Sequence, residues 1–328
     1  MADFIHPKEL AKRFPILAKK SFGQNFLVHG PILNTISQKI LEHHPSTILE
    51  IGPGPASLSQ HLVPHVEKLI LVEKDVQFKE LLETVLNAES GSCPSSPPIS
   101  ASPELRAAGG NLDKPKPLRR VENSLEFAES ISPTRVTRSP VEIHFGDFLF
   151  CDLEKILKDK PQPIFAAGNL PYNVSVPIFE KLLLHKHLFS RFYLMFQKEV
   201  AERICAKPNT KAYGSLSLFS QMLADCKIIL PIPPSAFDPR PKIQSAVVEV
   251  IPLKTMRFEV DLDFFQQVIQ AAFQTRRKTL LNCLSGKFKR DKNEIEKLLQ
   301  SININPQRRA ETLSLEEFAK LTQSLFKG

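Results

Sequence analysis

The tetrapeptide Asn169-Leu-Pro-Tyr172 carries the most specific chemical signal in this sequence. An exocyclic amine on a purine is a poor nucleophile because its lone pair is delocalised into the ring. Two acceptors that hold both N–H groups would draw that lone pair out of conjugation. The Asn169 side-chain oxygen and the Leu170 carbonyl are suited to this task, with Pro171 holding the carbonyl and Tyr172 stacking on the base. The motif therefore predicts a site that modifies the amine of a flipped-out base, although such a tetrapeptide can also be a simple loop turn.

A glycine turn, Gly52-Pro-Gly54, follows the apolar run 47–51 and marks a second candidate site. Glycine lets the backbone approach a bound molecule because it has no Cβ, so we expect a ligand over Gly52 and Gly54, beside the free amides of a following helix. The pattern is Glu50-x-Gly-x-Gly, and Ser57 stands where a dinucleotide fingerprint would have its third glycine. The turn therefore favours S-adenosylmethionine, which has no pyrophosphate, over NAD. Such turns also occur in α/β proteins without this ligand.

Two carboxylates stand at the ends of predicted strands. Glu73 lies 21 residues after Gly52, close to the spacing at which a carboxylate accepts hydrogen bonds from a ribose. Asp147 follows the apolar run 141–145 and could accept from the exocyclic amine of the donor's adenine. Either could instead be an ordinary solvated strand end. Because ligands bind at the carboxyl edge of an open α/β sheet, we expect both carboxylates, the glycine turn and Asn169 to form one site.

The elements that must position these residues alternate along the chain. Apolar runs predict strands at 47–51, 68–73, 141–145, 163–168, 192–196, 227–230 and 247–251. Helical spacing of apolar residues predicts helices at 31–44, 58–66, 177–184, 197–204 and 216–222, and another that ends near residue 86. This alternation predicts a doubly wound, mostly parallel, Rossmann-like α/β sheet.

The charge of the chain favours an anionic partner. The formal net charge is +8 and the pI is about 9.2, and nucleic acid is the commonest partner of such a chain. Two clusters could hold RNA phosphates or be solvated basic faces. Their residues are Lys19, Lys20, Arg276, Arg277 and Lys278.

After residue 252 the predicted strands stop. Helical spacing then covers 264–283, 294–301 and 315–326. We therefore predict a methyltransferase domain at 1–252 and a helical RNA-binding domain at 253–328.

Three further residues could complete the site. Gln24 and Asn25 could reach the donor with their amide groups, or form an ordinary cap. Phe237 stands in the proline-rich segment 233–242, where it could cover the other face of the flipped base or be a buried staple.

The segment 88–140 differs in composition from the rest of the chain. It contains eight Pro, ten Ser and three Gly, and very few aromatic residues. This composition predicts a disordered or loosely held surface insertion. It falls between two predicted elements, so it should not interrupt the core.

Length and composition exclude several classes of protein. The chain has 328 residues, of which 42% are hydrophobic, so it can bury a sizeable core. Five cysteines without a C-x-x-C pair suggest neither a disulfide framework nor a zinc cluster, and we expect free thiols and no metal. No apolar run is long enough for a membrane span, and the mixed charges of residues 1–17 do not form a signal peptide. We therefore expect a cytoplasmic protein.

With these residues in view, the chain resembles the rRNA adenine N6-dimethyltransferases over nearly its whole length. The motifs that carry the resemblance occur in order. They are Phe22-Gly-Gln-Asn-Phe-Leu27, Glu50-Ile-Gly-Pro-Gly54, Gly146-Asp147, Gly168-Asn-Leu-Pro-Tyr172, Lys211-Ala-Tyr-Gly214, Pro233-Pro-Ser-Ala-Phe237, Lys242-Ile-Gln-Ser-Ala-Val247 and Gln274-Thr-Arg-Arg-Lys278. The insertion at 88–140 departs from the family's pattern.

The resemblance implies a specific reaction. It implies that S-adenosylmethionine donates two methyl groups to N6 of each of two adjacent adenosines in the 3′-terminal hairpin of small-subunit (16S) rRNA. It further implies a late role in assembly of the immature 30S-type subunit and a mostly monomeric cytoplasmic enzyme. The family's donor contacts carry over to Asn25, Leu27, Gly52, Glu73, Asp147 and Asn169.

Two other functions remain open from the sequence. Macrolide-resistance methyltransferases, which act on large-subunit rRNA, share the chemistry, but their tetrapeptide usually has Ile where this chain has Leu170. An assembly or transcription factor on the same scaffold could have lost catalysis. Intact Asn169, Tyr172 and Glu73 argue against that loss, although members of the family can do both jobs.

Overall fold

The computed structural model describes residues 5, 9–10, 13–14, 24–87, 141–275 and 277–327. The predicted insertion at 88–140 lies outside the described residues, and so do Lys19, Lys20 and Arg276. What we expect of these residues therefore stays a prediction.

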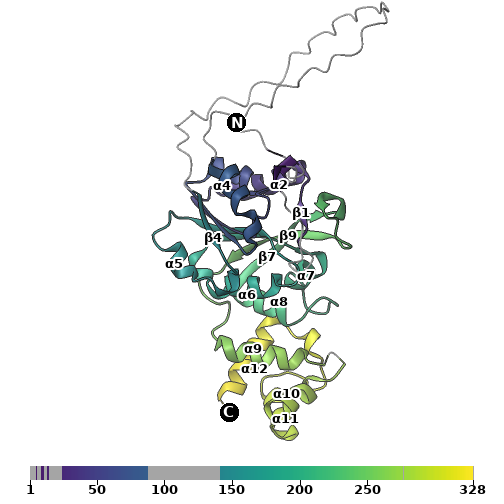
Figure 1. Cartoon of the computed structure of the whole chain (residues 1–328). Coiled ribbons are helices and arrows are strands. Elements are labelled where there is room, and N and C mark those ends of the chain that lie inside the picture. Colours follow the sequence, from purple (N-terminus) through teal and green to yellow (C-terminus); the bar gives the residue numbers. More distant parts are fainter. Residues whose placement is uncertain are drawn as a thin grey trace, which may run out of the picture. The chain divides into compact units, whose positions relative to one another are not determined.

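Seven strands of the described residues form one sheet, in the spatial order β4-β3-β2-β5-β6-β9-β7 (Figure 1). Their bounds are β2 Thr47–Ile51, β3 Lys68–Glu73, β4 Val141–Phe145, β5 Ile164–Asn169, β6 Arg191–Gln197, β7 Ala224–Ile232 and β9 Ser245–Pro252. The strands from β4 to β6 pair in parallel, whereas β9 runs antiparallel to both β6 and β7. The predicted Rossmann-like, mostly parallel sheet is thus confirmed. Its switch point lies between β2 and β5, because the chain order reverses there.

The helices of the described residues follow the strands. They are α2 Gly30–Leu41, α3 Ser59–Leu62, α4 Lys79–Asn87, α5 Leu153–Leu157, α6 Ser175–Leu184, α7 Lys198–Ile204, α8 Ser215–Leu223, α9 Leu262–Phe273, α10 Leu280–Phe288, α11 Lys292–Ser301 and α12 Leu315–Lys327. Short 3-10 helices that matter for the site are η2 Val63–His65, η3 Val76–Phe78 and η4 Phe148–Phe150. A separate two-stranded sheet pairs β1 Phe26–Leu27 with β8 Phe237–Asp238.

The central strands of the sheet are buried on both faces. Successive strand residues point to opposite faces, so Ile48 of β2 belongs to one hydrophobic core and Leu49 to the other. Helices α2, α3 and α4 cover the face of Ile48, whereas α5, α6, α7 and α8 cover the face of Leu49 (Figure 1). Burial on both faces explains why β2 is a continuous apolar and β-branched run with only Glu50 charged.

The helix after the glycine turn is much shorter than the predicted 58–66. Only α3 is α-helical, and the chain then makes the 3-10 turn η2. Pro64 explains the difference, because it has no amide N–H to continue the helical ladder and its ring would clash with the carbonyl of Gln60. The predicted length of this helix is therefore wrong, whereas the predicted free amides at its start stay a prediction.

The C-terminal region is helical, as predicted, but its first helix is divided. The predicted continuous spacing over 264–283 becomes α9 and α10, because Thr279 is extended and Leu280 donates its amide to Arg308 O at 2.8 Å. Tyr213, which precedes α8, donates its hydroxyl to Leu313 O at 3.0 Å, so this region packs on the helices of the sheet. The domain boundary at 252 stays a prediction. No helix among the described residues could cross a membrane.

Candidate functional site

A pocket of about 410 Å³ lies at the carboxyl ends of β2, β3 and β5. We call it the edge pocket. It is lined by Gln24, Asn25, Phe26, Gly52, Gly54, Glu73, Asn169, Leu170, Pro171 and Tyr172. The structure therefore brings the glycine turn, the predicted ribose carboxylate and the whole tetrapeptide together, as the sequence predicts.

Two glycines allow close packing of the backbone here, Gly54 in the lining of the edge pocket and Gly168 just before Asn169. Gly54 has a φ of +52°, and a Cβ there would lie 3.2 Å from the Phe26 ring. At Gly168, in β5, a Cβ would lie only 2.5 Å from the Ile51 carbonyl oxygen. Any side chain at Gly168 would push β5 away from the end of β2. It would also displace Asn169 and Leu170 at the end of β5, which we call the Asn169 corner.

Asn169, the last residue of β5, is held by the N-terminal segment. Its Nδ2 donates to the backbone oxygen of Asn25 at 2.8 Å. This bond fixes the carboxamide so that Oδ1 is left as an acceptor, and no donor in the described parts of the chain reaches Oδ1. The Leu170 amide donates to Met195 O at 3.3 Å, while no described donor reaches the Leu170 carbonyl. Two acceptors thus stand side by side along the chain at the end of β5.

Tyr172 is fixed by a residue that the sequence did not single out. Its hydroxyl shares a hydrogen bond of 2.7 Å with Ser245 Oγ, and Ser245 is fully buried in β9. Burial raises the pKa of Tyr172, so its hydroxyl stays protonated at neutral pH. The Tyr172 side chain is therefore uncharged, and the hydrogen bond of its hydroxyl to Ser245 fixes the orientation of the ring.

Glu73 is a buried carboxylate that holds the glycine turn. Its Oε2 accepts from the Gly54 amide at 3.0 Å, and its Oε1 accepts from the Asp75 amide at 2.8 Å. Burial raises the pKa of Glu73, which is only 5% exposed. Each carboxylate oxygen has a second lone pair, so Glu73 can still accept from a hydroxyl in the edge pocket.

Asp147, a predicted donor contact, does not line the edge pocket. Its Oδ1 accepts from the Leu149 amide at 3.0 Å and caps η4, while its Oδ2 accepts from Lys74 Nζ at 2.8 Å. The bond from Lys74 holds the pKa of Asp147 below its usual value. The predicted contact of Asp147 with the donor's adenine stays a prediction.

Phe237 is more buried than its predicted role requires. Its side chain is 4% exposed and belongs to the core that contains Ile48. The cause is the pairing of β8 with β1, which sets Phe237 opposite Leu27. The ring is thus a buried part of the core, and its predicted stacking on a base stays a prediction.

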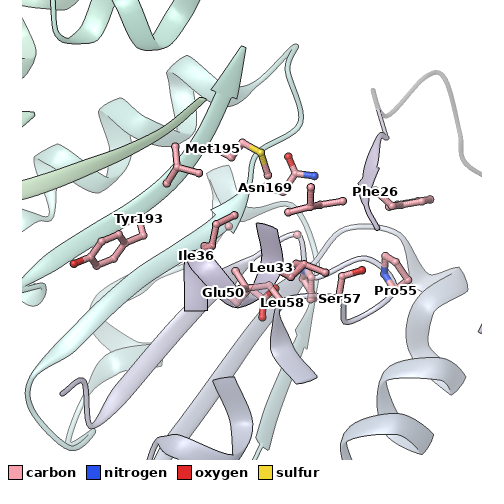
Figure 2. A pocket seen from close by; sticks show the side chains of 15 residues that line it. Phe26, Leu33, Ile36, Glu50, Pro55, Ser57, Leu58, Asn169, Tyr193 and Met195 are labelled. Atoms are coloured by element: carbon pink, nitrogen blue, oxygen red, sulfur yellow. The ribbon is translucent and has the colours of Figure 1, made fainter. Parts of the chain in front are cut away.

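A second hollow, of about 510 Å³, adjoins the edge pocket (Figure 2). We call it the inner pocket. It shares Phe26, Gly52 and Asn169 with the edge pocket. Its remaining lining is mostly apolar and consists of Leu27, Leu33, Ile36, Glu50, Pro53, Pro55, Ser57, Leu58, Gly168, Tyr193, Met195 and Val247.

Two polar groups of the inner pocket are buried. Ser57 is 6% exposed, and its Oγ finds no hydrogen-bond partner in the described part of the structure. Glu50 accepts from Ser59 Oγ at 2.6 Å, and burial raises its pKa to about 7. A buried hydroxyl without a partner costs free energy, so Ser57 is suited to meet a polar group of a ligand.

The buried Glu50 makes a prediction for stability. The folded chain keeps a proton on Glu50 that the unfolded chain loses above about pH 4.5, so the free energy of unfolding should fall as the pH rises from about 4.5 to about 7. The total fall from Glu50 is about 3 kcal/mol, at about 1.36 kcal/mol for each pKa unit. Glu50→Gln cannot ionise and should lose this part of the pH dependence in urea unfolding at pH 5 and pH 8. The exposed Glu67→Gln is the control, and equal pH dependence of both variants would contradict the assignment.

The predicted RNA-binding residues are placed only in part. Arg277 and Lys278 are exposed in the segment between α9 and α10.

Leu27, a predicted donor contact, lines the inner pocket.

Asp75 lines neither pocket but holds Gln24, which lines the edge pocket, and sequence reasoning missed this role. It is 1% exposed, and its Oδ2 accepts from Gln24 Nε2 at 3.0 Å. It thus ties the segment before Asn25 to the end of β3. The only sequence signal was its place two residues after Glu73. For Ser245 the signal was its place in the motif Lys242–Val247.

The described residues offer little for metal binding or thiol chemistry. Among the described residues, no group of three His, Cys, Asp or Glu side chains could hold a metal ion. The described cysteines 151, 205, 226 and 283 are free thiols, and burial raises the pKa of each.

The sequence is similar to known methyltransferases over almost its full length. The family model for ribosomal RNA adenine dimethylase matches residues 16–93 and 116–327, and the unmatched residues between them fall within the predicted insertion. A ribosomal RNA small subunit methyltransferase A from Syntrophotalea carbinolica is 38% identical over 309 residues, which make up 93% of this chain and 96% of that relative. One from Bacillus mycoides is 31% identical over 335 residues, covering 99% of this chain and 98% of the relative.

Solved structures share the fold. A dimethyladenosine transferase from Plasmodium falciparum has a TM-score of 0.63 at 21% identity, covering 90% of this chain and 96% of its own. The 23S rRNA methyltransferase ErmE has a TM-score of 0.57 at 16% identity, covering 92% of this chain and 100% of its own. At these identities the likeness concerns the fold alone.

Proposed function

This chain belongs to the ribosomal RNA adenine dimethylase family, and on that premise we propose that it methylates N6 of adenosines in small-subunit rRNA. The methyl donor is S-adenosylmethionine, which supplies a methyl group bound to a sulfonium. The observation that carries the proposal is the Asn169 corner. The Asn169 carboxamide is fixed by the Asn25 carbonyl, and Asn169 and Leu170 line the same pocket as Glu73.

The residues of the two pockets fit this donor. The Glu73 carboxylate would accept from the ribose hydroxyls, and the turn Gly52–Gly54 lets the backbone lie close to the donor. Asn25 and Leu27 would bind from the N-terminal segment, and the buried Ser57 hydroxyl offers a hydrogen bond to a polar end of the donor. Asp147 would bind the adenine amine from the neighbouring strand end.

The tetrapeptide would then act on the substrate amine. Asn169 Oδ1 and the Leu170 carbonyl would each accept one N–H, which frees the nitrogen lone pair for in-line attack on the methyl group. The N–C bond would form as the S–C bond breaks, the donor would leave as a neutral thioether, and the methylated nitrogen would lose one proton to water. Tyr172 would stack on the flipped adenine. Flipping costs a few kcal/mol, and stacking on an aromatic ring offsets about 1–3 kcal/mol of it. The acceleration of methyl transfer therefore comes from positioning and desolvation, without a dedicated strong base.

The finer parts of the proposal rest on the family. We propose that the target is the pair of adjacent adenosines in the 3′-terminal hairpin, in immature 30S-type subunits, and that a monomer acts in the cytoplasm. The names and nearly full-length matches of the relatives support the small-subunit target. We also propose that residues 253–328 form an RNA-binding domain.

A large-subunit target is the second candidate. The fold does not separate it from the first, because ErmE, a 23S rRNA methyltransferase, has a TM-score of 0.57 with this chain. The relatives at 31–38% identity favour the small subunit, since each is named for that subunit.

Incubation with labelled donor tests the proposal. Immature small subunits and, separately, large subunits are treated with the chain, and the labelled nucleotides are mapped. We expect label only in small-subunit rRNA, at adjacent adenosines near its 3′ end. Label in the large subunit would support the second candidate, and no label in either would favour a binding protein without catalysis.

The basic cluster makes a separate prediction for RNA binding. Changing Arg276, Arg277 and Lys278 to Gln should lower the slope of log affinity against log salt, by about 0.7–0.9 for each phosphate that the variant no longer binds. Filter binding at several salt concentrations measures the slope. The exposed Lys297→Gln on α11 is a control for a single surface charge. An unaltered slope in the triple variant would indicate a solvated basic face.

A further inference from the structure

The loop 239–244 connects two walls of the edge pocket. We call it the mouth loop. At its start, Asp238 pairs with Phe26 in the sheet of β8 and β1. At its end, Ser245 shares the 2.7 Å hydrogen bond with the Tyr172 hydroxyl. Phe26 and Tyr172 both line the edge pocket, so each end of the mouth loop is attached to a residue of the pocket lining.

The mouth loop has a well-held backbone. Pro239 and Pro241 restrict it, because proline fixes φ. Gln244 accepts two hydrogen bonds from Lys198. The Lys198 amide donates to the Gln244 backbone oxygen at 2.9 Å, and Lys198 Nζ donates to Gln244 Oε1 at 3.2 Å. The side chains of the loop therefore project from a frame that is tied to the sheet and to Tyr172.

Two cations on the mouth loop are exposed. Arg240 and Lys242 face solvent, and neither forms an ion pair within the described residues. The carboxylate of the exposed Asp238 is at the start of the loop and is the nearest acidic group along the chain. Solvated charges are common on protein surfaces, but these two belong to a fixed loop whose end is bonded to Tyr172 of the edge pocket.

We propose that Arg240 and Lys242 bind the backbone phosphates on either side of the target adenosine. The inference rests on the proposed function and adds to it a further RNA contact, distinct from Lys19, Lys20 and residues 276–278. A base that enters the edge pocket leaves its flanking phosphates outside, where the mouth loop lies. Arginine binds phosphate with two parallel N–H groups, and such contacts set the register of the nucleic acid without reading its sequence.

The loop also links phosphate binding to the stacking ring. Ser245 directly follows the loop and holds the Tyr172 hydroxyl, so a loop anchored on phosphates keeps the ring over the base. Arg240 and Lys242 are thus positioning residues for the target strand.

The double variant R240Q/K242Q tests the proposal on the full-length chain with immature small subunits. We expect the KM for RNA to rise severalfold, and the salt slope of RNA binding to fall by about 1.4–1.8 because two phosphates are no longer bound. Donor binding without RNA, measured by calorimetry, should be unchanged. The charge-keeping variant R240K/K242R should keep most of the affinity. The control K155Q/K158Q removes two exposed cations elsewhere and should leave KM unchanged.

Two outcomes would overturn the inference. One is a salt slope for R240Q/K242Q equal to that of the original chain. The other comes from D238N, which removes the carboxylate of the loop and should lower the KM for RNA. If D238N raised KM as much as R240Q/K242Q does, the effect would come from a distorted loop and not from phosphate binding. Failure of the proposed function would look different, because the original chain itself would then not methylate small-subunit rRNA.

Discussion

Asn169→Ala is expected to lower kcat for methyl transfer by about 10²–10³-fold, the usual cost of losing one preorganised group that acts on the reacting atom. The alanine removes Oδ1, so one N–H of the substrate amine loses its acceptor and the lone pair stays in the ring. It also removes the bond to the Asn25 carbonyl. Donor binding should be largely kept, because Glu73 and the glycine turn remain. Single-turnover transfer and calorimetry measure the two quantities separately.

Asn173→Ala is the matched control for this prediction. Asn173 is exposed and lies just after the tetrapeptide, so its loss changes the same chemical group without touching the edge pocket. Near-normal turnover by Asn169→Ala would refute the role given to the corner.

Glu73→Gln is expected to weaken donor binding by roughly tenfold to a hundredfold, since hydrogen bonds to a charged group contribute about 1.5–3 kcal/mol. The amide keeps the size of the side chain but offers one acceptor oxygen in place of two. One of the bonds to the Gly54 and Asp75 amides is also broken. Turnover at saturating donor should change much less than donor affinity.

Calorimetry without RNA measures this effect directly. Glu80→Gln, on the exposed face of α4, is the control for removal of a carboxylate near the same strand. An unchanged donor affinity in Glu73→Gln would remove this residue from the site.

The centre of the sheet could be predicted from the sequence because its strands are buried on both faces. Such strands are short continuous apolar runs, and β2 and β3 are nearly pure examples. Once the strands were known, the carboxyl edge of a parallel sheet placed Gly52, Glu73 and Asn169 together. The most distinctive residues of the site were therefore accessible to reasoning from pattern alone.

What could not be predicted depends on contacts between distant segments. The pairing of β1 with β8 buries Phe237, and nothing local at Phe237 signals that pairing. The bond between Tyr172 and Ser245 joins residues 73 positions apart. The short helix α3 is a different case, because the local sequence contains both signals and Pro64 outweighs the helical spacing of Leu58, Leu62 and Val66.

The most direct test of the central claim is the identity of the product nucleoside. Small-subunit rRNA treated with the chain and S-adenosylmethionine is digested to nucleosides, and the methylated species is identified by mass spectrometry against standards. We predict N6,N6-dimethyladenosine, because the two oxygens of Asn169 and Leu170 select an exocyclic amine and the family is that of the adenine dimethylases. Methyl groups on a ribose oxygen, a ring carbon or another base would contradict it.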